Sequence, residues 1–202
     1  MTSPELSVDG DLNRADPTNR LDEHTGTFDG SVLTVRYRLV GDECARRVKS
    51  GVGGISDERT LAALLALPTA GLARVPRRLG PALQRAEAAH LAVLLEDPEG
   101  GQWGRRTVDA PLEVLEIEVR ARDWRAGIAI AHRWAGYGAR IVRLEHDLCD
   151  ELILSEASYW GIGVAMEGAD EPVLPPTHVR GRRWSAARWR FAEQVYAQAS
   201  RS

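Results

Sequence analysis

Three short apolar runs in the second half of the chain have the length and the β-branched content of buried strands. They span residues 114–119, 139–144 and 161–166, and amphipathic stretches separate them. Asp123 and Asp147 stand where they can cap helices that begin in the two intervals. The resulting β-α-β-α-β order predicts a small mixed sheet with parallel neighbouring strands and helices packed against it.

The first half of the chain shows mainly helical periodicity after one initial strand. Residues 31–40 alternate, with Val35 and Tyr37 on one face, and a short helix is expected over 42–49. Leucines then recur at helical spacing in three pieces between prolines, over about residues 56–67, 69–75 and 79–90. An Asp-Pro-Glu-Gly-Gly turn then predicts a β-hairpin with strands near 92–95 and 103–108. The expected fold class is therefore α/β, or α+β overall.

The composition indicates the cellular compartment in which we expect the protein. Hydrophobic residues make up 44% of the 202 residues and charged residues 27%, as is usual for a globular protein. No run approaches the roughly 18 apolar residues that a membrane span needs, and the N-terminus has no basic-then-apolar leader. Cys44 and Cys149 lack zinc-site spacing and suit a reducing compartment. We therefore expect a cytoplasmic protein with no membrane partner.

Charge is distributed unevenly, although the net charge is only −3. Residues 31–90 carry ten bases and five acids, and residues 171–202 carry six bases and two acids. Acids prevail by seven to two in residues 1–30 and by fifteen to eight in residues 91–170. Basic segments around an acidic one indicate that separate parts have separate tasks. Ordinary fluctuation between short windows is the alternative.

The stretch GLARVPRRLGPALQRAEAAHL, residues 71–91, resembles the core of winged helix-turn-helix domains. In such a domain Leu79, Leu83 and Ala86 face the core. The resemblance covers about residues 56–108 and implies contacts with the phosphates and base edges of double-stranded DNA. The side chains that would make these contacts are Arg74, Arg77, Arg78, Gln84 and Arg85. A plain three-helix packing module with solvated arginines is the alternative.

The apolar run at residues 114–119 also carries charged residues at alternate positions. Because successive side chains of a strand point to opposite faces, Leu115, Ile117 and Val119 should share the core face. The other face should then carry Glu116, Glu118 and Arg120. An ordinary solvated strand face with internal ion pairs is one interpretation of this pattern.

Glu118-Val119-Arg120, followed by a helix, resembles the (D/E)xK strand of PD-(D/E)XK nucleases. The resemblance covers about residues 105–167. It implies that Glu118 and an upstream acid, for which Asp109 is the candidate, bind Mg²⁺, and that the residue at Arg120 positions the attacking water. Arginine departs from the family's lysine because it is a planar, permanently protonated group. This departure predicts a nuclease-like pseudoenzyme; an active Mg²⁺-dependent DNA endonuclease using Asp109, Glu118 and Arg120 is the alternative.

The C-terminal segment interleaves arginines with tryptophans and precedes an amphipathic helix over 185–199. Arg182 and Arg183 could contact phosphates beside stacked bases. The alternative is a helix that docks its tryptophans on the domain and leaves its arginines in water.

These patterns divide the chain into four expected parts. They are a disordered acidic tail (1–30), a winged helix-turn-helix-like unit (31–108), a nuclease-like α/β domain (109–170) and a basic C-terminal linker and helix (171–202). The expected function is DNA binding in recognition or regulation, with no cofactor unless Mg²⁺ serves an active site. A protein-interaction scaffold is the rival without nucleic acid, and a homodimer is left open.

Overall fold

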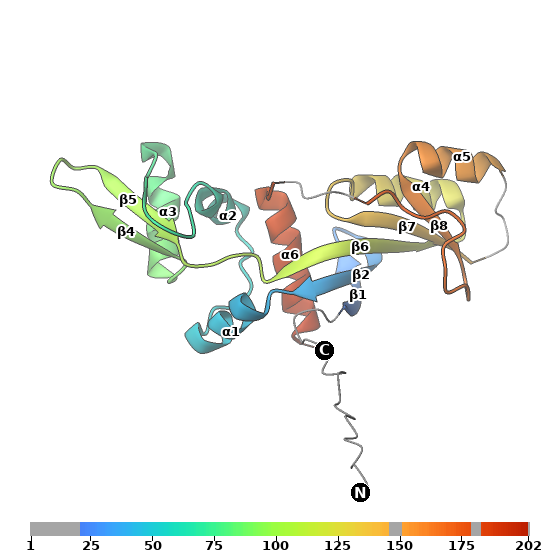
Figure 1. Cartoon of the computed structure of the whole chain (residues 1–202), viewed down its shortest axis with the longest axis horizontal. Helices are drawn as coiled ribbons and strands as arrows, with labels where there is room; N and C mark the ends of the chain where they lie inside the picture. The colour runs from blue at the N-terminus through green and yellow to red at the C-terminus, as the bar shows by residue number, and fades with distance from the viewer. Residues whose placement is uncertain (1–20, 146–150, 179–182, 202) are drawn as a thin grey trace, which may run out of the picture.

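The structure, a computed structural model, describes residues 21–145, 151–178 and 183–201. Its larger part is a five-stranded sheet with the strand order β1-β2-β6-β7-β8 (Figure 1). The strands are β1 Asp22–Phe28, β2 Ser31–Leu39, β6 Leu112–Ala121, β7 Ala139–Leu144 and β8 Ile162–Met166. β2 is antiparallel to β1 and β6, whereas β6, β7 and β8 are parallel. The predicted α/β class with a mixed sheet is confirmed.

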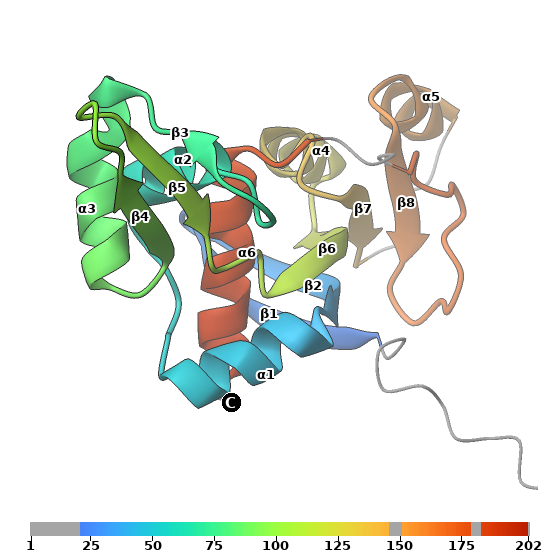
Figure 2. The same cartoon turned by 60° about the vertical axis from the view of Figure 1, so that its left-hand side comes forward.

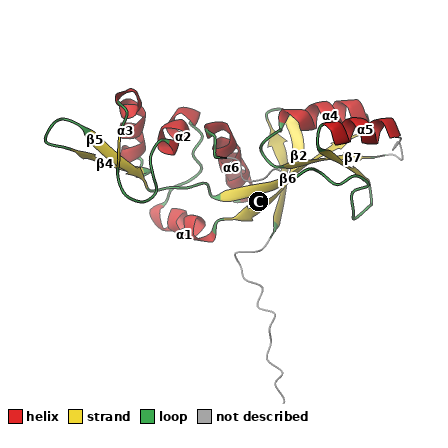
Figure 3. Cartoon of the chain, turned by 45° about the horizontal axis from the view of Figure 1, so that its top comes forward, coloured by secondary structure: helices red, strands yellow, loops and turns green. Residues whose placement is uncertain are grey.

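Two helices connect the parallel strands and lie on the same side of the sheet (Figure 3). They are α4, Trp124–Arg133, and α5, Glu151–Tyr159. The Asp123 side chain caps α4 as predicted, because it accepts a hydrogen bond from the backbone N–H of Arg125 at 3.0 Å. The expected cap Asp147 lies outside the described residues. Within the described part of the chain, every helix is too short or too polar to cross a membrane.

The first strand begins at Asp22, inside the segment 1–30 that was predicted to be a disordered tail. Residues 22–28 form β1, which pairs with β2 along its whole length. Asp29 and Gly30 close this hairpin with φ of 44° and 78°, the left-handed conformation that favoured two-residue hairpin turns need. β1 is an edge strand with exposed alternate residues, so a polar composition that is typical of a tail suffices to form it. Residues 1–20 lie outside the described residues.

Strand β2 lies between β1 and β6 in the main sheet, although the boundary 31–108 assigned it to the winged helix-turn-helix-like unit. The chain leaves the sheet after β2 and returns to the adjacent position at β6. Residues 41–110 therefore form an insertion between two neighbouring strands, which we call the inserted lobe. The predicted boundary was wrong because pairing between strands so far apart in the sequence leaves no local signal.

The inserted lobe combines helices with a three-stranded sheet of order β3-β5-β4 (Figure 2). Its elements are α1 Gly41–Ser50, α2 Glu58–Leu65, β3 Ala73–Arg74, the 3-10 helix η2 Arg77–Leu79, α3 Gly80–Ala88, β4 Ala92–Glu96 and β5 Gln102–Arg106. The first and third predicted helical pieces and the hairpin are present. The middle helix predicted over 69–75 is wrong, because Ala73 and Arg74 pair with β5 as a short strand. Pro76 favours extended backbone in the residue before it.

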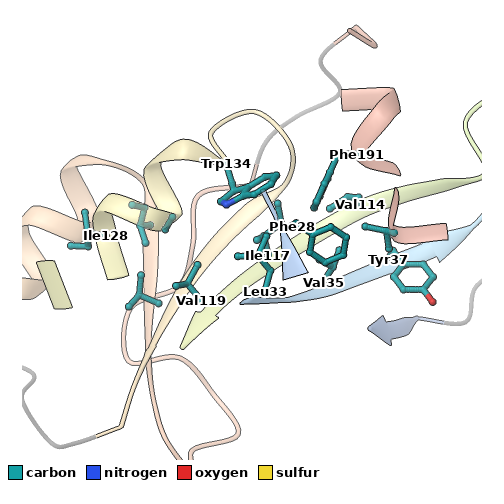
Figure 4. Packing of buried hydrophobic residues seen from close by; sticks show 14 of the residues in the cluster. Phe28, Leu33, Val35, Tyr37, Val114, Ile117, Val119, Ile128, Trp134 and Phe191 are labelled. Atoms are coloured by element: carbon teal, nitrogen blue, oxygen red, sulfur yellow. The ribbon is translucent and has the colours of Figure 1, made fainter. Parts of the chain in front are cut away.

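Helix α6, Ala186–Ala199, joins the cores of the two parts of the molecule. Phe191 lies in the sheet core beside Trp134, as Figure 4 shows. The centroids of the two rings are 4.8 Å apart. Trp189 is buried instead in the core of the inserted lobe, with Leu61 and Leu83. The prediction of a separate C-terminal part over 171–202 is therefore wrong, whereas its alternative of docked tryptophans describes Trp189.

Candidate nucleic-acid interface and nuclease-like face

Helix α3 and the turn before it present most of the predicted DNA-binding side chains. Leu83 and Ala86 are buried in the core of the inserted lobe, and Leu79 packs against it, as predicted. Gly80 and Pro81 begin the helix, where proline costs no hydrogen bond. This anchoring leaves four side chains exposed to solvent, namely Arg77, Arg78, Gln84 and Arg85.

A cleft of about 400 Å³ lies between the start of α3 and the hairpin β4–β5. Arg74, Arg77 and Gln84 line it, together with Glu96 and Glu99. Guanidinium and amide groups are the donors that proteins use toward phosphates and base edges. The structure thus brings three of the predicted residues together in what we call the α3 cleft.

The other predicted DNA-binding residues lie outside the α3 cleft. Arg85 lines a separate cavity of about 450 Å³ that also contains Asp57. Arg78 is exposed beside Arg77 but lines neither cavity. Arg183 is exposed shortly before α6, and Arg182 lies outside the described residues.

The second candidate site is the face of the main sheet opposite the core, which we call the sheet face. Glu118 of β6 is only 5% exposed and lies between two arginines. Its Oε2 is 3.0 Å from Nη2 of Arg143 in β7, and its Oε1 is 3.7 Å from Nε of Arg120. Thr34 of β2 is its cross-strand neighbour. Glu167 lines the same cavity of about 250 Å³.

A second ion-pair group continues across the sheet face. Nε of Arg36 donates to Glu23 at 3.0 Å, and its Nη1 donates to Glu116 at 2.8 Å. The hydrogen bond to Glu23 raises the pKa of the Arg36 guanidinium. Burial raises the pKa of Glu116, although Arg36 opposes this effect. Acids and arginines therefore alternate and largely neutralise one another on this face.

A β-bulge changes the predicted alternation within β6. Ile117 and Val119 are buried as expected, but Leu115 lies at the register shift between β2 and β6. Val114 occupies the core position instead. The charged positions after the bulge keep the predicted common face.

Asp109 does not lie near Glu118, contrary to the expected shared metal site. Its carboxylate binds Arg106 at 2.9 Å in the last part of the inserted lobe. The strand from Leu112 to Glu118 alone extends over about 20 Å, at about 3.3 Å per residue. The chain enters β6 from the inserted lobe, so the strand itself separates the two acids.

The side chains that could act as metal ligands at the sheet face do not fit Mg²⁺. This ion typically takes one or two carboxylates together with waters and phosphate oxygens. Each carboxylate oxygen of Glu118 already faces an arginine, and the opposing strand offers Thr34 in place of a second acid. Across residues 21–145, 151–178 and 183–201, no three His, Cys, Asp or Glu side chains form a group that could hold a metal ion.

A third charged cluster, which the sequence analysis missed, is buried where α1 meets α6. Arg47 is 1% exposed, and its two Nη atoms each donate to one carboxylate oxygen of Glu193 at 2.7 Å. Its Nε donates to Glu43 at 2.6 Å, and the backbone carbonyl of Asp109 accepts from Nη2 at 2.7 Å. Nε1 of Trp189 also donates to Glu193. The i,i+4 spacing of Glu43 and Arg47 was the available sequence signal.

Comparisons with family models, with curated proteins and with solved structures gave no match for this chain.

Proposed function

We propose that this protein binds double-stranded DNA through the α3 cleft and the adjacent Arg78, and that its nuclease-like sheet serves recognition or regulation without cutting. The observation that carries the proposal is that Arg77 and Arg78 lack side-chain partners within the described residues. Among the described residues, neither side chain takes part in an ion pair or a hydrogen bond with another side chain. By contrast, Arg36 and Arg143 on the sheet face have carboxylate partners.

The position of these cations supports a DNA contact. Arg77 and Arg78 lie in η2, directly before α3, and Gln84 lies one turn into the helix. In helix-turn-helix proteins the first residues of the recognition helix reach base edges in the major groove, while nearby cations fix the register on phosphates. The hairpin β4–β5 forms the other wall of the cleft, so a duplex could contact both elements.

The chemistry of the sheet face supports a role without cleavage. The order of strand, helix and strand after Glu118 favours the nuclease-like interpretation of the fold. Phosphodiester hydrolysis in that family needs a metal held by two acids, whereas Glu118 is bound by arginines and faces Thr34. Loss of one positioned catalytic group typically costs a factor of about 10² to 10⁴ in rate.

The proposal is tested by fluorescence anisotropy with a labelled duplex of about 20 base pairs at several salt concentrations. The double variant Arg77→Ala/Arg78→Ala should weaken binding and reduce the salt slope by about one for each lost phosphate contact. The matched control is Arg122→Ala/Arg125→Ala, which removes the same charge from exposed positions near the far end of β6. The control should bind like the unaltered protein.

Three results would contradict the proposal. Equal binding by the Arg77/Arg78 variant and the unaltered protein would exclude this surface. Equal loss in both double variants would show a response to net charge alone. Binding to neither duplex nor single strand would favour the protein-interaction scaffold instead.

A further inference from the structure

The outward face of the three-stranded sheet in the inserted lobe carries an exposed aromatic ring. Trp103, in the second position of β5, is 39% exposed. Its cross-strand partner in β4 is Leu95, which is 51% exposed, and its partner in β3 is Arg74. The next residue, Gly104, belongs to the opposite face, where a Cβ would collide with Leu94. An exposed tryptophan therefore lies at the centre of a sheet face that no other element covers in the described part of the chain.

The hairpin turn holds this ring in place. Nε1 of Trp103 donates to the Asp97 carboxylate at 3.1 Å, and the same carboxylate accepts from the backbone N–H groups of Glu99 and Gly101. Asp97 is therefore tied to the edge of the indole and to the turn. A ring that is already ordered loses less conformational freedom when a ligand stacks on it.

Two cations flank the ring on the same face. Arg74 lies opposite Trp103 on β3, and Arg105 lies two residues further along β5, so that its side chain points the same way. Both are exposed, and neither forms an ion pair with a residue in the described part of the chain. An aromatic ring with flanking guanidinium groups is the combination that binds unpaired nucleic-acid strands, since bases stack on the ring while phosphates meet the cations.

Arg74 also connects this face to the α3 cleft, which it lines with Arg77 and Gln84. We propose that the outward face of the three-stranded sheet binds an unpaired DNA strand, with one base stacked on Trp103 and phosphates at Arg74 and Arg105. This inference rests on the proposed duplex contact at α3 and gives it a substrate class. The preferred ligand is DNA in which a duplex continues into a single-stranded tail.

The experiment compares three labelled probes by fluorescence anisotropy. They are a blunt duplex of about 20 base pairs, the same duplex with a tail of about ten thymidines, and the thymidine strand alone. The unaltered protein should bind the tailed duplex more tightly than either other probe. Trp103→Ala should weaken binding of the tailed duplex by about 5-fold to 150-fold, the factor that stacking of one base contributes, and should leave the blunt duplex unaffected.

Two further variants separate stacking from a change in folding. Trp103→Phe keeps an aromatic ring and should retain most of the preference for the tail. Trp160→Ala is the matched control, because Trp160 is 41% exposed but lies outside the inserted lobe, after α5. It should bind all three probes like the unaltered protein.

The outcomes also distinguish this inference from the proposed function. If the thymidine strand binds through Trp103 while the blunt duplex does not bind, the duplex contact fails and the strand site stands. If the blunt duplex binds but Trp103→Ala leaves the tailed duplex unaffected, the duplex contact stands and this inference is overturned. Tighter binding of an RNA tail than of a DNA tail would overturn the choice of DNA.

Discussion

Replacing Arg47 by methionine should lower the free energy of unfolding by about 3 kcal/mol, the lower end of the range for removing one partner of a buried ion pair. The side chain of Arg47 is 0% exposed, and its guanidinium joins Glu43 and Glu193. Methionine fills much of the same volume, so the main cost is the loss of charge and hydrogen bonds. Typical folded domains have only about 5–15 kcal/mol of stability in total, so this is a large change.

We expect a loss at the lower end of this range because both carboxylates keep other hydrogen-bond donors when Arg47 is replaced. Glu43 keeps two hydrogen bonds from Arg46, at 2.6 and 2.8 Å. Glu193 keeps the N–H donors of Trp189 and of the Ile55 backbone, at 2.8 and 3.1 Å. Neither carboxylate is left without a donor, although Glu193 loses its bidentate cation.

The matched control is Arg122→Met. Arg122 forms an ion pair with Glu145 at 2.7 Å, as short as the pair between Arg47 and Glu193, but its side chain is 83% exposed. Exposed pairs typically contribute about 0–1 kcal/mol, because water screens them and both side chains lose rotamer freedom. The two substitutions thus remove pairs of equal length and differ in burial.

Urea unfolding followed by circular dichroism gives both free energies on one scale. Arg47→Lys, which keeps the charge but loses the two-pronged geometry, should fall between the unaltered protein and Arg47→Met. A loss of less than about 1 kcal/mol for Arg47→Met, equal to that for Arg122→Met, would refute the reasoning. So would an Arg47→Lys variant that is less stable than Arg47→Met.

Two further predictions concern acidity and cleavage. Burial opposes ionisation of Glu43, but hydrogen bonds from Arg46 and Arg47 outweigh it and lower its pKa below the ordinary 4.5. Its stabilising contribution is therefore present above that pH and lost as the pH falls through the folded-state pKa; urea midpoints should show a smaller acid dependence in Glu43→Gln. Arg120→Lys should leave plasmid DNA intact with Mg²⁺ or Mn²⁺, because the second acid is still missing; metal-dependent nicking, abolished by Glu118→Ala, would contradict this.

The sequence predicted those parts of the fold that local periodicity determines. The helices around Leu61 and Leu83, the hairpin and the parallel strands all bury residues at regular spacing. It failed where stability comes from distant partners. β1 has polar alternate residues and exists because it pairs with β2. The lobe is an insertion because β2 pairs with β6, and no short-range sequence pattern indicates this pairing.

At the candidate site, too, the sequence predicted the geometry within one strand but not the neighbours on other strands. Alternation in β6 correctly placed Glu118 and Arg120 on one face, because adjacent positions in one strand fix their own geometry. A metal site depends on which strand lies beside Glu118, and Asp109, the upstream acid that the resemblance suggested, was a poor guide to that neighbour. The strand beside Glu118 is β2, which contributes Thr34, and the strand on the other side contributes Arg143. A carboxylate with a threonine and a guanidinium as neighbours is an ion-pair partner, and the cross-strand neighbours of Glu118 therefore decide its chemistry.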